Sequence, residues 1–248
     1  MNKILLVILF LLLIAVGHKR GAKAFFTFLV SFILIIIYIF LMGLGINAII
    51  LAFITCILAS IVSLFFLNGN NLKTKSAFMS VILVQLIISF PIYMISKRAN
   101  LGAFGVESLE SIGGYNFYIN YNMSDVLIGV FLVSIIGTII DTSISVASAM
   151  NEVLDNNPLI DDRELRQSGM SVGGDILSTT INTLFFALIS TFIGYFMWHR
   201  GIMFEEIIND KTFVREIIQL FIAFIGSISI IPITALISSK WLKKNIYK

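Results

Sequence analysis

Apolar runs alternate with short charged clusters along the whole chain. Six of the runs are 19 to 24 residues long, and a seventh, at the start of the chain, has 14. The runs cover residues 4–17, 25–44, 47–67, 77–95, 126–149, 175–198 and 217–238. A helix of about 20 apolar residues crosses a hydrocarbon core about 30 Å thick. The pattern therefore predicts an all-α, polytopic bundle of transmembrane helices with seven spans, in a single integral membrane domain.

The first run is ambiguous because its 14 residues would cover only about 21 Å as a helix. That length also fits the apolar core of a signal peptide, and Ala15 and Gly17 resemble a cleavage site. His18, Lys19 and Arg20 follow at once, however, and such a cluster holds the downstream side in the cytoplasm. We therefore expect the first run to be retained as a span.

Composition supports a lipid environment. Hydrophobic residues make up 58% of the 248 positions and charged residues 12%, about half the charged share of an ordinary soluble domain. So few charges cannot cover the surface of a soluble protein of this size, which excludes a soluble globular enzyme. The net charge of +3 comes mostly from lysines and arginines that flank the apolar runs, so we expect the lipid bilayer, and no nucleic acid, as a partner.

The distribution of basic residues predicts the orientation. With the N-terminus outside and the C-terminus inside, 11 of the 17 lysines and arginines lie on the cytoplasmic side. The remaining six are Lys3, Lys97, Arg98, Arg200, Lys211 and Arg215. Because cytoplasmic loops carry an excess of such residues, the split favours this N-out, C-in arrangement.

Three connections have their own character. The outer segment 96–125 contains several glycines and aromatic residues, which predicts a loop at the level of the lipid headgroups. The inner segment 151–174 predicts a short amphipathic helix from Asp162 to Met170 on the cytoplasmic surface, with Leu165 and Met170 on its apolar side. The outer segment 199–216 mixes acids and bases and suggests another short surface helix.

A polar stripe marks the fifth run. At spacings of three or four residues, it consists of Ser134, Gly137, Asp141, Ser145, Ser148 and Glu152. Asp141 would lie about 22 Å below the start of the run, in the inner half of the hydrocarbon layer. A carboxylate at that depth needs a partner, a water-filled cavity or a proton.

The sixth run offers possible partners for Asp141. Asp175, Thr179 and Asn182 share one face, and antiparallel packing would bring Thr179 and Asn182 near the level of Asp141. Gly137 and the serines would let the two helices approach closely. Three interpretations stay open: a proton or ion pathway through Asp141, interhelical hydrogen bonds that only hold the bundle together, and a position of Asp141 at a wet interface.

Other chemistry is sparse. Cys56 is the only cysteine, and no group of Cys, His or acidic residues has metal-ligand spacing, so we expect no metal, cofactor or catalytic residue. His18 and His199 lie at the ends of apolar runs and are expected to be interfacial. Gln85 and Gln219 are expected to form hydrogen bonds between helices.

Several motifs resemble those of the YibE/F family of bacterial membrane proteins. They are GTIIDTSISVASAMNEV from residue 137, NNP from residue 156, ELRQSGMSVGGDILSTTINTL from residue 164, NGNNLKTKSA from residue 68 and GSISIIPITALI from residue 226. The chain departs from the family pattern at Gly174, where an Arg is common, and at Ser178, where a Gly is common. The resemblance implies the cytoplasmic membrane of a bacterium.

Longer members of that family carry a soluble domain after the first span. This chain looks like the short member of a pair, which implies a hetero-oligomer with a longer sibling, or else a homo-oligomer. The central motifs are in turn similar to the fourth and fifth helices of the RND permeases and of SecD and SecF, where an Asp helix carries proton relay.

These resemblances imply a permease or export subunit whose proton or ion site comprises Asp141, Asn182, Thr179, Asp175 and Ser145. The rival interpretation is a structural or assembly subunit that does not transport. An intramembrane aspartyl protease is the weakest alternative, since Asp175 lies too near the surface to face Asp141.

Overall fold

The computed structural model describes residues 2–98, 122–198 and 204–243, and these ranges form helices and connecting turns without a strand. Six of the helices are long and apolar enough to cross a membrane. In chain order the helices are α1 (Asn2–Gly43), α2 (Ala48–Ile61) continued by the π-helical turn η1 (Val62–Phe66), α3 (Leu72–Arg98), α5 (Met123–Asn156), α6 (Asp162–Trp198), α7 (Phe204–Asn209) and α8 (Lys211–Lys243).

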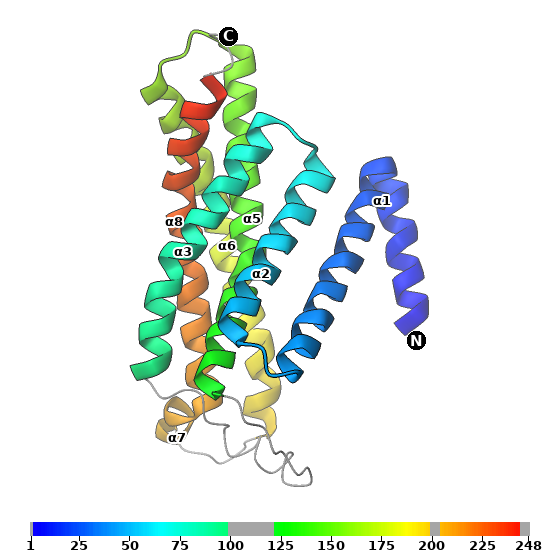
Figure 1. Ribbon diagram of the computed structural model, residues 1–248, viewed down its shortest axis with the longest axis vertical. Helices are drawn as coiled ribbons and strands as arrows, with labels where there is room; N and C mark the ends of the chain where they lie inside the picture. The colour runs from blue at the N-terminus through cyan, green and yellow to red at the C-terminus, as the bar shows by residue number, and fades with distance from the viewer. Residues whose placement is uncertain (1, 99–121, 199–203, 244–248) are drawn as a thin grey trace.

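The first two predicted runs lie together in α1, which folds back on itself at His18 (Figure 1). The backbone there has φ 46° and ψ −125°, a region that L-residues rarely adopt. The turn is tight, because a Cβ on Gly21 would overlap the carbonyl oxygen of Leu13. The rings of Phe10 and Phe25 pack across it with centroids 4.7 Å apart. The sequence pattern therefore located the two segments, and the structure joins them by a sharp backbone turn.

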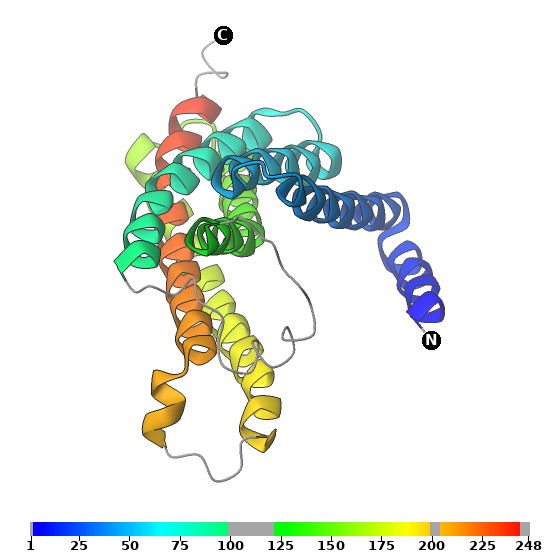
Figure 2. The same ribbon diagram turned by 60° about the horizontal axis from the view of Figure 1, so that its bottom comes forward.

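The helices run up and down between two ends of the bundle, with α5 at the centre (Figures 1 and 2). One end, which we call the α5–α6 end, holds the turn of α1 at His18, the α2–α3 and α5–α6 connections and the end of α8. The other, the α7 end, holds the α1–α2 connection, the start of α5 and α7. This alternation is the one that the apolar runs predict. Which end faces the cytoplasm stays a prediction.

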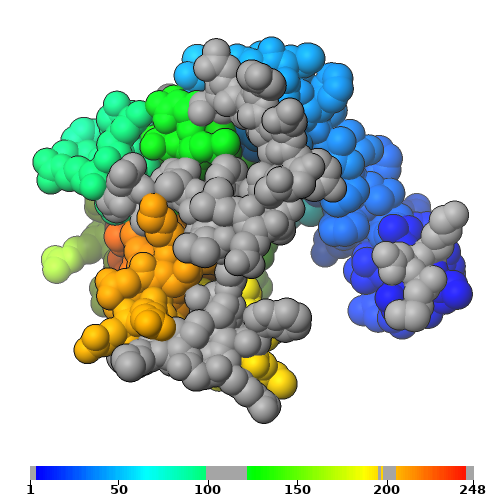
Figure 3. Space-filling model, turned by 90° about the horizontal axis from the view of Figure 1, so that it is seen from below, coloured from blue at the N-terminus to red at the C-terminus, as the bar shows by residue number. Residues whose placement is uncertain are grey.

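Most of α1 lies at the edge of the bundle. Viewed from the α7 end, its N-terminal arm stands apart from the ends of α5 and α8 (Figure 3). The arm exposes large apolar side chains, including Ile4, Val7 and Leu11. In a membrane such side chains face lipid, which solvates them as well as a protein interior would.

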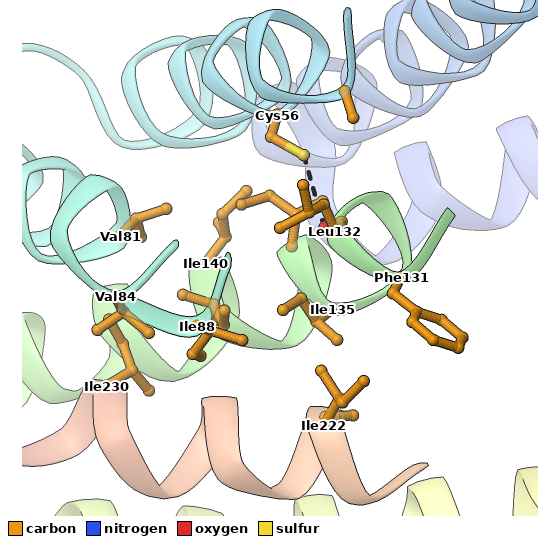
Figure 4. Packing of buried hydrophobic residues seen from close by; sticks show 14 of the residues in the cluster. Cys56, Val81, Val84, Ile88, Phe131, Leu132, Ile135, Ile140, Ile222 and Ile230 are labelled. Atoms are coloured by element: carbon orange, nitrogen blue, oxygen red, sulfur yellow. Dashed lines mark hydrogen bonds between the residues drawn. The ribbon is translucent and has the colours of Figure 1, made fainter. Parts of the chain in front are cut away.

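The apolar core lies where α5 meets α2, α3 and α8. Phe131 and Ile135 of α5 are at most 1% exposed and belong to the same cluster as Ile88 of α3 and Ile230 of α8 (Figure 4). Cys56 of α2 is fully buried beside them, and its Sγ donates to the carbonyl oxygen of Leu132 over 3.6 Å.

Small polar side chains tie three helices together near the α5–α6 end. The Oγ of Ser143 on α5 donates to the carbonyl oxygen of Ala77 on α3 over 3.0 Å, and accepts from Thr234 Oγ1 on α8 over 3.4 Å. The Oγ atoms of Ser76 and Ser238 lie 2.9 Å apart. Small side chains let the helix backbones approach closely, and their hydroxyl groups supply the bonds between helices.

The glycine expected to bring α5 and α6 together does not do so. A Cβ added to Gly137 would meet nothing within 4 Å. Close approach occurs instead at Gly129 against Tyr38, at Gly169 against Met150 and at Gly173 against Ile231. The buried side of α5 is mainly apolar, and the polar stripe that includes Gly137 remains on the outside.

The predicted amphipathic segment is helical, but it is not a separate surface helix. Residues 162–170 form the first turns of α6, which continues unbroken to Trp198. Leu165 is fully buried between α5 and α8, whereas Met170 is 46% exposed and so does not share its environment. Gly169 and Gly173 let α6 pack directly on its neighbours, and therefore no break is needed between the segment and the span. An ion pair of 2.7 Å joins Asp162 to Lys243.

The connections at the α7 end are partly described. The prediction of a headgroup-level loop falls mainly on residues 99–121, which lie outside the described residues. At its two sides, Lys97 of α3 pairs with Asp125 of α5 over 3.3 Å. In the later connection, α7 is the short helix that was expected, while Arg215 and Glu216 already belong to α8.

Candidate functional site

The polar stripe of α5 lies on the outer surface of the helix. Asp141, Ser145 and Glu152 are exposed, while Ile139 and Ile140 beside Asp141 are buried. Asp141 is 18 residues into a helix of 34, or about 27 Å along an axis of about 51 Å. Asp141 therefore lies near the midpoint of α5, on the outside of the helix and not in the core.

Asp141 lines a groove of about 440 Å³ between α5 and α6. The α5 side of this groove is formed by Thr138, Asp141, Thr142 and Ser145, and the α6 side by Ile176, Thr179, Thr180, Thr183 and Leu184. We call it the Asp141 groove. Most of its lining residues carry a hydroxyl group, so the groove is polar at a level where the rest of the outer surface is largely apolar.

The hydroxyl groups on α6 are oriented by their own helix. Thr179 Oγ1 donates to the carbonyl oxygen of Ile176 over 2.8 Å, and Thr183 Oγ1 donates to that of Thr179 over 2.9 Å. Each hydroxyl proton thus points to the backbone, and the oxygen lone pairs remain available as acceptors. Together with the carboxylate of Asp141, these oxygens make a site suited to water, a proton or a small cation.

The structure brings together three of the five predicted site residues. Asp141, Ser145 and Thr179 line the groove, whereas Asn182 and Asp175 are exposed and are not among its lining residues. At about 100° per residue, Asn182 is about 200° around α6 from Thr180. Asp175 and Asn182 do share a face, as expected, but both are exposed outside the groove lining.

Sequence reasoning did not assign Thr138, Thr142, Thr180 and Thr183 to the site. Thr138 and Thr142 flank the stripe on α5, and Thr180 and Thr183 stand three residues apart on α6. A search for the face of α6 richest in threonine would have favoured this side. The pattern alone could not choose it, since two polar faces overlap at Thr179.

A second groove, of about 210 Å³, continues toward the α7 end. Ser134 of α5, Thr191 of α6, and Glu216 and Gln219 of α8 supply its polar lining, and Leu184 lines both grooves. We call it the Glu216 groove. Gln219, expected to bond another helix, thus faces a groove. Gln85 is 3% exposed, and its Nε2 has no hydrogen-bond partner among the described residues.

Among the described residues, no group of three or more His, Cys, Asp or Glu side chains is placed to hold a metal ion. Cys56 is a buried free thiol in the core.

A bundle of long apolar helices with a polar groove at mid-length defines a polytopic membrane protein. The family model for YibE/F-like protein matches residues 5–244, and the chain belongs to the YibE/F family. Neither the curated proteins nor the solved structures contain a match to it. The motifs from residues 137 and 164 fall on α5 and α6 and supply the lining of the Asp141 groove.

Proposed function

We propose that this chain is a subunit of a permease or exporter in the bacterial cytoplasmic membrane, and that Asp141 takes up and releases a proton or small cation during its cycle. The observation that carries the proposal is the position of Asp141 in an open groove of about 440 Å³ near the middle of α5. The proposal involves no enzymatic step.

The chemistry of the groove supports this role. A charged carboxylate within the hydrocarbon core costs up to about 2.5–3.5 kcal/mol on insertion scales. Among the described lining residues of the Asp141 groove there is no lysine or arginine that would offset this charge. A bound proton or cation neutralises the carboxylate and so lowers this cost. The neighbouring hydroxyl oxygens help to hold the bound cation. Exchange of the bound proton or cation requires that water reach the groove.

The second candidate function is that of an assembly subunit. It is favoured by the exposure of the stripe itself, since lipid cannot satisfy the polar groups of Asp141, Ser145 and Thr179. In this alternative a longer YibE/F sibling, or a second copy of the chain, covers the groove and bonds these side chains. Asp141 then stays in one protonation state.

Replacement of Asp141 by Asn distinguishes the two candidates. The amide keeps the size and hydrogen-bonding capacity of the acid but cannot gain or lose a proton. We expect Asp141→Asn to abolish complementation of a deletion strain, while protein level and membrane insertion stay normal. Asp141→Glu is the matched control, because it keeps a titratable group, and it should retain part of the function.

Assembly is measured in the same strains by co-purification of the sibling. Full complementation by Asp141→Asn would overturn the proton or cation role. Loss of complementation together with loss of the sibling would instead support the assembly function, since the aspartate would then act through the interface.

A further inference from the structure

We infer that the Asp141 and Glu216 grooves form one hydrated path, along which a proton or small cation reaches Asp141 from the α7 end, with Glu216 as its first acidic group. The path is the new element. Its assignment to a cation rests on the proposed function, whereas its hydration does not.

Continuity of the two grooves is the first argument. They share Leu184, and Ser134 in the Glu216 groove lies on the same stripe of α5 as Asp141. Seven residues separate Ser134 from Asp141, which is about 10 Å along the helix. On α6 the lining runs from Thr179 to Thr191 without leaving one side of the helix. The grooves are therefore successive parts of one channel-like surface along α6, which faces α5 at Asp141 and mainly α8 at Glu216.

The chemistry of the lining is the second argument. Ser134 Oγ donates to the carbonyl oxygen of Phe131 over 2.9 Å, and Thr191 Oγ1 donates to that of Ala187 over 3.1 Å. As in the Asp141 groove, the hydroxyl oxygens keep lone pairs for water. Among the described lining residues of both grooves, the charged side chains are the two acids Asp141 and Glu216. Such a surface favours water and cations over anions.

The position of Glu216 is the third argument. It stands five residues after Lys211, the first residue of α8, so it lies about 8 Å from the α7 end of that helix. Gln219, on the same side of α8, lies one turn deeper. The order from the end inward is thus Glu216, Gln219, Ser134 and Asp141. An acid at the mouth raises the local concentration of cations next to the path.

Thiol labelling in native membranes tests hydration without any transport assay. A thiol reacts as a thiolate, which forms in water and not in lipid. The wild-type chain gives the baseline, since its one cysteine, Cys56, is fully buried. Ser134→Cys and Gln219→Cys place a thiol in the Glu216 groove. Ile225→Cys is the matched control on α8, because Ile225 is 47% exposed and lies about 180° around the helix from Glu216.

We expect a water-soluble, membrane-impermeant methanethiosulfonate reagent to modify Ser134→Cys and Gln219→Cys at least about tenfold faster than Ile225→Cys. Equal and slow rates at all three positions would overturn the path. The charge of the path is tested with a cationic and an anionic reagent of similar size. The cationic one should react several-fold faster at Ser134→Cys, and Glu216→Gln should remove most of this preference. A preference that persists unchanged in Glu216→Gln would overturn the role of Glu216.

The two proposals fail separately. If Ser134→Cys is labelled but Asp141→Asn complements, the path stands as a hydrated groove, and the proposed function and the assignment of the path to a cation fail. If Asp141→Asn does not complement at normal protein level but Ser134→Cys is as slow as Ile225→Cys, the path fails and the proposed function stands.

Discussion

Gly173 of α6 lies against Ile231 of α8 so closely that a Cβ on the glycine would overlap the Ile231 side chain. The next residue, Gly174, would meet nothing within 4 Å. Two adjacent glycines of one helix thus have opposite environments. The contact at Gly173 holds α6 to α8 at the α5–α6 end, close to where α6 enters the Asp141 groove at Ile176.

This contrast gives the first prediction. Gly173→Ala should lower stability by about 1–3 kcal/mol, because isoleucine is branched at Cβ and cannot easily move its methyl group out of the way. Gly174→Ala should leave stability unchanged or raise it by up to about 1 kcal/mol, since alanine favours the helix. Thermal denaturation of the purified protein in detergent measures both. Equal melting temperatures for the two variants would contradict the packing of α6 on α8.

Tyr38 and Gly129 give the second prediction. The hydroxyl of Tyr38 on α1 is buried against Gly129 of α5 and has no hydrogen-bond partner among the described residues. Tyr38→Phe should therefore be neutral or slightly stabilising. Gly129→Ala should weaken the packing of α1, because a Cβ there collides with that hydroxyl and lies 3.2 Å from the Ala48 carbonyl oxygen.

The double variant is the decisive comparison for this pair. Removal of the hydroxyl relieves the collision but not the tight contact with Ala48, so Tyr38→Phe should recover part of the stability lost in Gly129→Ala. Melting temperatures of the four proteins give the coupling. Strict additivity would show that the two residues do not touch.

The third prediction separates structure from function on one helix. Ser143 bonds to α3 and α8 inside the bundle, and Ser145 lines the Asp141 groove. Ser143→Ala should lower stability by about 1 kcal/mol, the usual loss for a hydrogen bond between membrane helices. Ser145→Ala should leave the melting temperature unchanged, because its side chain is exposed. A larger stability loss for Ser145→Ala than for Ser143→Ala would reverse the assignment of the two faces.

The fourth prediction concerns orientation. A reporter fused after Lys248 should be cytoplasmic, and one inserted near Gly113 should be external, because 11 of the 17 basic residues then lie inside. A fusion protein that is active only in the cytoplasm, paired with one that is active only outside, measures both sites. Both reporters on the same side of the membrane would contradict the seven-span arrangement. That result would also change the side of the membrane from which the Glu216 groove is reached.

Much of the fold follows from the sequence because lipid imposes a simple rule. Every backbone polar group in the hydrocarbon core must be bonded within the chain, so long apolar runs have to be helices. Their lengths and the charged clusters between them therefore predict the spans. The spacing of Asp141 and Ser145 predicts a polar stripe on one helix, and antiparallel packing of the next run predicts that Thr179 lies near its level.

Tertiary packing decided the rest. The extension of α6 back to Asp162 depends on Gly169 and Gly173 fitting against Met150 and Ile231, which no local pattern reveals. The choice between the two polar faces of α6 depends on how that helix rotates to pack on α8. That rotation leaves Asn182 and Asp175 outside the lining of the Asp141 groove, and it places Thr180 and Thr183 in that lining. Glu216 joins the same surface only because α8 packs beside α5. It lies about 75 residues after Asp141, and no local sequence pattern predicts a contact between segments so far apart.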